Sequence, residues 1–148
     1  MKQIFTIGTS KKSAENFFKF LEYNEVKFVI DVRLNNTSQI CGFSKYPDIK
    51  FFLNRISNIE YVVDNQLAPT QDLLKAYKNK NIYWEKYVEE FNKLMKERDI
   101  IRYIKTIYED LDKYCLLCSE QKPDYCHRRL LAELIRDNFE DYKIVHLF

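Results

Sequence analysis

One segment near the end of the chain carries most of the side chains that could do chemistry. Within LLCSEQKPDYCHRRLLAELI, residues 116–135, two cysteines, one of the two histidines and two arginines occur together. Thiols and imidazoles serve as nucleophiles, proton carriers or metal ligands, and guanidinium groups bind anions. We therefore predict a functional site here. Its candidate residues are Cys118, Glu120, Cys126, His127 and Arg128.

The same segment predicts a helix start, with Asp124 as the N-cap. Cys126 and His127 would then lie in the first helical turn, where unpaired backbone amides and the helix dipole favour an anion or a thiolate. Helical spacing turns both side chains toward the preceding strand, with Arg128 on their flank. We expect the three to converge above the end of that strand.

Three kinds of chemistry compete for the cysteines. A structural zinc site is suggested by the C-x2-C spacing of Cys115 and Cys118, but a strand sends residues three apart to opposite faces. A thiol nucleophile is the second alternative, with Cys126 the better placed because the helix start, His127 and Arg128 would stabilise its thiolate. In the third, the cysteines are buried small hydrophobes and Arg128 binds an anion without covalent chemistry. We expect no metal and no other cofactor.

A second charged group, in VIDVR, follows the second expected strand. Asp31 and Arg33 are two residues apart, so they share one face at the carboxyl end of this strand. In open α/β sheets the ligand crevice lies outside the carboxyl ends of the strands. Two alternatives remain open: a role in ligand binding, or a mutual ion pair that closes the top of the sheet.

Glycine usage excludes two common nucleotide-binding loops. With Gly8 and Gly42 as its only glycines, the chain contains neither a GxGxxG fingerprint nor a GxxxxGK[ST] phosphate loop. Gly8 ends the first expected strand, in TIGTS, where the missing Cβ permits a sharp turn or close approach to a ligand. Ser10 adds a hydroxyl at the same strand end, and we count both residues as candidate ligand contacts.

Apolar runs that are typical of strands alternate with segments of helical period, which predicts an α/β fold. We expect one three-layer, Rossmann-like domain with a mostly parallel sheet over residues 1–148, a usual length for a single domain. The expected strands are Gln3–Ile7, Lys27–Arg33, Glu60–Val63, Tyr114–Cys118 and Tyr142–Leu147.

Composition limits location and partners. No segment approaches the roughly 18 apolar residues of a membrane span, and the apolar run before Gly8 is too short for a secretory signal. We expect a cytoplasmic protein that does not associate with membranes and whose four cysteines form no disulfide framework. A net charge of +2 gives no overall attraction to nucleic acid, so any anion site must be local. No feature of the sequence fixes an oligomeric state.

Several motifs of the chain, taken in order, resemble those of a known family. They are TIGTS, DVRLNNTS, CGFSKYPDIKFFL, LAPTQDLLKAYKNKNIYWEKYVEEF, LLCSEQKPDYCHRRLLAE and the closing VHLF, and they are similar to motifs of domain-of-unknown-function family 488. The resemblance implies a Rossmann-like α/β domain of bacterial or archaeal type and no established activity. One departure is Thr9, where many members carry the histidine of TIGHS. The matching motif positions are Gly8, Ser10, Asp31, Arg33, Ser38, Cys118, Glu120, Cys126, His127 and Arg128.

These features together predict a crevice at the strand ends that binds or acts on a phosphate-bearing small molecule, a nucleotide or a nucleic acid. Arg33 and Arg128 would hold the anion, and the enzyme would be a hydrolase or transferase that acts on a phosphate-bearing substrate. Asp31 or Glu120 would act as general base, with His127 as acid. Thiol chemistry at the two cysteines and a non-catalytic module that binds nucleic acid or protein are the alternatives.

Overall fold

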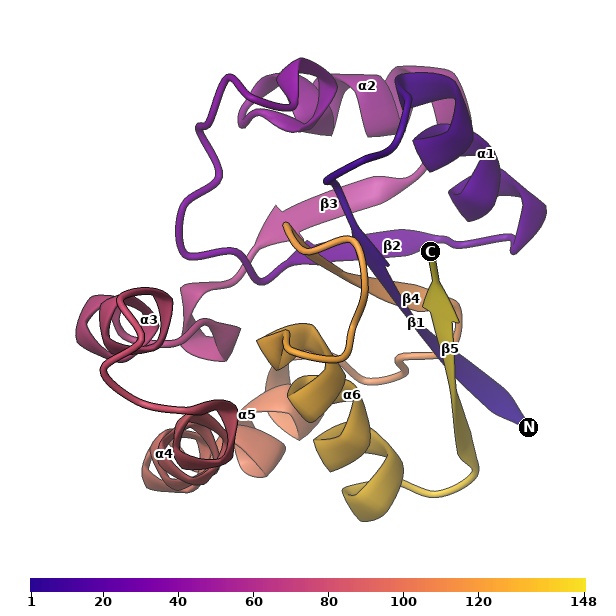
Figure 1. Cartoon of the computed structure of the whole chain (residues 1–148). Coiled ribbons are helices and arrows are strands. Elements are labelled where there is room, and N and C mark those ends of the chain that lie inside the picture. The colour runs from indigo at the N-terminus through magenta and orange to yellow at the C-terminus, as the bar shows by residue number, and fades with distance from the viewer.

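The computed structural model describes all 148 residues and contains a five-stranded sheet whose strands are all parallel (Figure 1). The strand order is β3-β2-β4-β1-β5. This confirms the α/β prediction, and the sheet is parallel throughout rather than mostly parallel. The strands are β1 (Lys2–Gly8), β2 (Phe28–Asp31), β3 (Glu60–Val63), β4 (Tyr114–Cys118) and β5 (Tyr142–Leu147).

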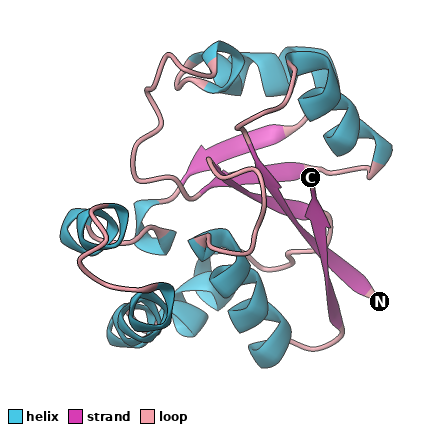
Figure 2. Ribbon diagram, in the orientation of Figure 1, coloured by secondary structure: helices cyan, strands magenta, loops and turns pink.

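Helices cover both faces of the sheet, which gives the three layers expected from the sequence (Figure 2). One face, called the α1 face, carries α1 (Ala14–Tyr23) and α2 (Asp48–Ser57). The other, called the α6 face, carries α3 (Gln71–Lys78), α4 (Trp84–Glu97), α5 (Ile100–Ile107) and α6 (His127–Asn138). Two short 3-10 helices, η1 (Gly42–Ser44) and η2 (Asn65–Leu67), lie in the connections after β2 and β3. No helix is long and apolar enough to span a membrane.

Two hydrophobic cores follow from the alternation of side chains along the strands. On β1, Ile4 packs into the core of the α6 face and Phe5 into that of the α1 face. The same alternation separates two cysteines of β4: Cys115 belongs to the α1 face and Cys118 to the α6 face. The two therefore cannot grip one ion, as their spacing predicted.

The topology places a crevice above β4. From the carboxyl end of β4 the chain continues into α6 on the α6 face, whereas its neighbours β1 and β2 continue toward α1 and α2 on the α1 face (Figure 1). Ligand sites of open α/β sheets form where adjacent strands send their connections to opposite faces. The loops after β2 and β4 should therefore border the site.

Candidate functional site

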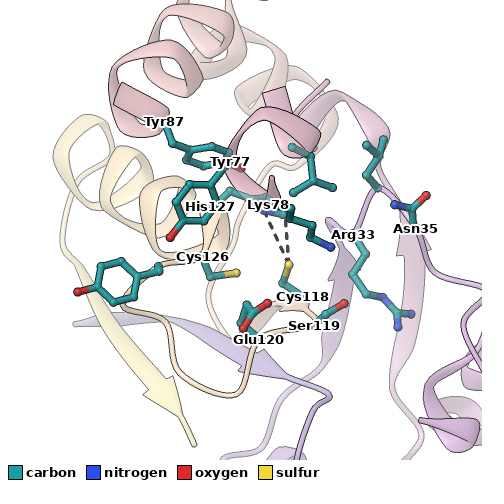
Figure 3. Close-up of a pocket in the computed structure, with 13 residues that line it drawn as sticks. Arg33, Asn35, Tyr77, Lys78, Tyr87, Cys118, Ser119, Glu120, Cys126 and His127 are labelled. Atoms are coloured by element: carbon teal, nitrogen blue, oxygen red, sulfur yellow. Dashed lines mark hydrogen bonds between the residues drawn. The ribbon is translucent and has the colours of Figure 1, made fainter. Parts of the chain in front are cut away.

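A cavity of about 110 Å³ opens at the carboxyl ends of β2 and β4, and we call it the strand-end pocket (Figure 3). Residues that follow these two strands form its floor, α3 and α4 form one wall, and the start of α6 forms another. Its lining residues are Arg33, Leu34, Asn35, Leu74, Tyr77, Lys78, Tyr87, Cys118, Ser119, Glu120, Tyr125, Cys126 and His127.

Two thiols and an imidazole come together in this pocket. The Sγ atoms of Cys118 and Cys126 and a ring nitrogen of His127 all lie within 4.8 Å of one another. Their side chains are nearly buried, with exposed fractions of 6%, 3% and 6%. The sequence predicted that Cys126 and His127 would meet the end of β4, but it expected Arg128 there as well, and Arg128 does not line the pocket.

A backbone carbonyl fixes the ring of His127. Its Nε2 lies 2.7 Å from the carbonyl oxygen of Val32. Because a carbonyl oxygen only accepts hydrogen bonds, Nε2 carries the proton and donates it. Nδ1 is then the ring nitrogen with a free lone pair.

The sulfur of Cys118 does not point at either ring nitrogen of His127. Its Sγ is 3.8 Å from both Nδ1 and Nε2, the two dashed contacts of Figure 3. A sulfur aligned with the lone pair of one nitrogen would lie clearly farther from the other, so Cys118 faces the ring between them. Although Cys118, Cys126 and His127 offer three metal-ligating atoms, this arrangement does not fit a shared zinc ion unless the ring turns.

The pKa values of the two thiols in the pocket are shifted in opposite directions. A hydrogen bond with Cys126 lowers the pKa of the Cys118 thiol, aided by the backbone amide of Ser119 and the charge of Arg128, and these effects outweigh burial. Burial raises the pKa of the Cys126 thiol well above its usual range, and the neighbouring Cys118 raises it further. Cys118 is therefore the thiol that loses its proton more readily, whereas the sequence favoured Cys126 for that role.

The start of α6 explains part of this reversal. The helix begins at His127 with Cys126 as its N-cap, so the prediction of Asp124 as N-cap was wrong. Cys126 has extended backbone angles, φ −133° and ψ 138°, and its side chain makes no capping hydrogen bond. The thiol is consequently free to turn toward Cys118 instead of satisfying the helix amides.

Arg128 lies outside the strand-end pocket, beneath the loop that follows β4. Its guanidinium is fully buried, and its NH1 and NH2 groups donate to the carbonyl oxygens of Glu120 (2.6 Å) and Gln121 (3.2 Å). The loop also lies against Gly8, where a Cβ would be 1.6 Å from the Glu120 oxygen. The absence of a Cβ at Gly8 thus leaves room for the backbone of the protein's own loop.

Arg33 and Asp31 form the ion pair that was one of two sequence-based alternatives. Arg33 donates from Nε to Asp31 Oδ1 (2.9 Å) and from NH2 to Asp31 Oδ2 (2.7 Å), and NH2 also reaches the Ser44 carbonyl at 2.8 Å. The Tyr61 hydroxyl donates to the same carboxylate. Both members are nearly inaccessible, with exposed fractions of 0% for Asp31 and 5% for Arg33. In Figure 3 the Arg33 guanidinium points away from Cys118.

The remaining predicted residues lie elsewhere. Ser38 is exposed, and its hydroxyl accepts a hydrogen bond from the Ile40 amide within a turn. Ser10 borders a separate surface groove, which shares Glu120 and Tyr125 with the pocket. Of the ten predicted positions, the pocket is lined by Arg33, Cys118, Glu120, Cys126 and His127, and not by Gly8, Ser10, Asp31, Ser38 or Arg128.

Sequence reasoning missed the aromatic wall of the pocket. Tyr77 of α3 and Tyr87 of α4 have ring centroids 5.1 Å apart, and both line the cavity. Tyr87 belongs to the core of the α6 face and is only 2% exposed. Lys78 adds a cation at the mouth. The only sequence feature that could have indicated aromatic residues at the pocket is Tyr125, which directly precedes Cys126 and lines the cavity.

Comparison with known proteins gives a family match. The sequence model described as Domain of unknown function DUF488 matches residues 13–135. No curated protein and no solved structure matches the chain. The matched range includes the loop after β2, α3, α4, β4 and the start of α6, and therefore every element that lines the strand-end pocket.

Proposed function

The chain belongs to the family Domain of unknown function DUF488, and from that premise we propose that it is an enzyme whose Cys118 thiolate attacks a small molecule held in the strand-end pocket. The observation that carries the proposal is the thiol at the pocket floor whose pKa is lowered by a hydrogen bond with Cys126. A thiolate is the reactive form of cysteine, and a depressed pKa increases its share at neutral pH.

The neighbours of Cys118 have complementary roles in this proposal. Cys126 stabilises the thiolate by donating a hydrogen bond. His127, held through Nε2 by the Val32 carbonyl, offers Nδ1 as a proton carrier for the leaving group. The aromatic wall of Tyr77 and Tyr87 supplies an apolar surface for the substrate.

We favour thiol chemistry over phosphate binding because both arginines already have hydrogen-bond partners within the protein. Asp31 and the Ser44 carbonyl engage Arg33, and two loop carbonyls engage Arg128. A buried guanidinium that leaves such partners for a ligand loses charge-assisted hydrogen bonds that the ligand must replace. The anion-binding role expected of Arg33 and Arg128 thus has less support than the thiolate.

The first prediction tests Cys118 by alkylation. In a Cys41→Ser background, which removes the partly exposed thiol, iodoacetamide should label Cys118 at pH 7. The rate should rise with pH through an apparent pKa below the usual value of 9.0. Additional replacement of Cys118 by serine should lower the labelling rate by at least about tenfold, because Cys126 stays protonated and Cys115 is fully buried.

The matched control is the Cys41→Ser protein unfolded in urea, where the thiols lose their folded surroundings. Peptide mapping identifies the labelled residue. Preferential labelling of Cys126, or a Cys118 rate at pH 7 no faster than in the unfolded chain, would refute the proposal.

A second candidate function is the binding of a phosphate-bearing ligand, and a different observation favours it. Lys12 Nζ and Arg128 Nε are both buried and have no hydrogen-bond partner. Burial lowers the pKa of Lys12, and the nearby charge of Arg128 lowers it further. Two neighbouring cations with unsatisfied donors favour an anion that bridges them.

This candidate predicts stabilisation by inorganic phosphate. At ten times its Kd, phosphate should raise the free energy of unfolding by about 1.4 kcal/mol and Tm by roughly 3–5 °C. Lys12→Met should abolish the shift, whereas Lys11→Met, a neighbouring exposed lysine, should retain it. Differential scanning calorimetry with chloride at equal ionic strength gives the comparison. An equal shift in both variants would exclude this site.

A further inference from the structure

We propose that Cys118 and Cys126 form a two-thiol centre that reduces small disulfides and closes to a Cys118–Cys126 disulfide. This inference rests on the proposed nucleophilic role of Cys118 and names the substrate class, a low-molecular-weight disulfide. It gives Cys126 a second role, in which the hydrogen-bond donor becomes the resolving thiol.

Proximity selects this pair among the four cysteines. The Sγ atoms of Cys118 and Cys126 are within 4.8 Å of each other, and both line the strand-end pocket. Cys115 points to the opposite face of the sheet, and the Cys41 thiol donates to the Thr9 carbonyl at 3.3 Å. Cys126 is therefore the thiol beside Cys118, and it belongs to the loop end that precedes α6.

The opposite pKa shifts of the two thiols determine which one attacks the substrate first. Cys118 attacks first because its pKa is lowered while that of Cys126 is raised. Its charge and its hydrogen bond are two causes that raise the pKa of Cys126. Once Cys118 is bonded to the substrate, both causes disappear, while His127 and Arg128 still lower the pKa of Cys126. The first step therefore removes two of the causes that raise the pKa of Cys126, while burial, the largest cause, remains.

The pocket restricts the substrate to small molecules. Both sulfurs lie at the floor of a cavity of about 110 Å³, in side chains that are 6% and 3% exposed. A disulfide within a folded protein cannot reach such a floor, whereas a slender disulfide with an aromatic or apolar substituent can lie against Tyr77 and Tyr87. Lys78 at the mouth favours an anionic group at the other end.

The proposed steps balance in atoms and electrons. Cys118 Sγ attacks one sulfur of the substrate RSSR′, the substrate S–S bond breaks, and R′S⁻ leaves and takes the proton of Cys126, which Nδ1 of His127 carries to it. Cys126 Sγ then attacks Cys118 Sγ, the mixed disulfide breaks, and RS⁻ leaves. Two electrons pass from the dithiol to the substrate, which is reduced to RS⁻ and R′SH. Two molecules of a free low-molecular-weight thiol regenerate the dithiol by the reverse exchange and leave as their own disulfide.

The test uses dithiodipyridine, a small aromatic disulfide, on the folded Cys41→Ser protein. Each attack releases one absorbing thiopyridone. We expect two thiopyridones per chain, no retained adduct, a mass lower by two hydrogens, and a peptide that links Cys118 to Cys126. With Cys126→Ser added, we expect one thiopyridone and a stable mixed disulfide on Cys118. Near-UV circular dichroism checks that each variant is folded.

The outcomes separate this inference from the proposed function. A stable mixed disulfide on Cys118 in the protein that retains Cys126 would overturn the two-thiol centre and leave the nucleophilic role of Cys118 intact. No release of thiopyridone, with rapid iodoacetamide labelling of Cys118, would also overturn the two-thiol centre alone. Absence of both reactions would overturn both proposals, as would stoichiometric zinc whose removal is needed before either thiol reacts.

Discussion

Replacing Gly8 by alanine is expected to lower the free energy of unfolding by about 3 kcal/mol or more. The added Cβ would lie 1.6 Å from the carbonyl oxygen of Glu120 and 2.6 Å from its carbonyl carbon. Both are backbone atoms, so no side-chain rotation relieves the overlap. The loop after β4 must move, and the 2.6 Å hydrogen bond from Arg128 to Glu120 must lengthen or break.

Gly42→Ala is the matched control for this change. No atom lies within 4 Å of the Cβ position at Gly42, and its backbone does not have a positive φ. Urea unfolding followed by circular dichroism should show a change within about 0.5 kcal/mol for Gly42→Ala. Equal effects of the two substitutions would show that the loop does not press on Gly8 as described.

The fold followed from the sequence because the pattern of each element agrees with its position. Three of the five strands have the predicted bounds, among them β4, and Ser13 caps α1 through a hydrogen bond from the Asn16 amide. Continuous apolar strands with helical segments between them predict a parallel sheet covered on both faces. The prediction for β2 extended to Arg33, but the strand ends at Asp31, whose carboxylate accepts the Arg33 amide in a turn.

The site was harder to predict because a buried charge needs a partner, and the sequence does not say which. Arg128 and Arg33 lie at strand ends, where an anionic ligand is one solution. The chain supplies another, with backbone carbonyls of Glu120, Gln121 and Ser44. Such carbonyls leave no trace in the sequence, since every residue has one.

The roles of Cys118 and Cys126 depended on a difference of a few residues in where α6 begins. With Asp124 as N-cap, Cys126 would have helix amides around it and would be the thiolate. With Cys126 itself as N-cap, its thiol faces Cys118, and the amide of Ser119 favours charge on Cys118 instead. Helix ends are the least certain part of any sequence-based assignment, and here one of them decides which of the two thiols has the lowered pKa.

The second large effect is expected for Asp31→Asn. The substitution keeps the shape of the side chain and removes its charge, so the buried guanidinium of Arg33 loses its only ion-pair partner. Breaking a buried pair by neutralising one member costs about 3–5 kcal/mol, because the remaining charge stays out of water without compensation. Arg33 still donates to the Ser44 carbonyl and to the amide oxygen of the substituted side chain. We therefore expect the free energy of unfolding in urea to fall by about 3 kcal/mol.

Asp137→Asn is the matched control, because Asp137 pairs with Arg136 at 2.9 Å on the surface, where the two side chains are 60% and 48% exposed. Solvent screening should hold its effect below about 0.5 kcal/mol. If Asp31→Asn were equally mild, Arg33 would not depend on Asp31 for its charge balance and could serve an external anion, which would restore phosphate binding as the leading function. A large loss for Asp31→Asn alone means that the pair stabilises the top of the sheet, and Arg33 is then not free to bind an external anion.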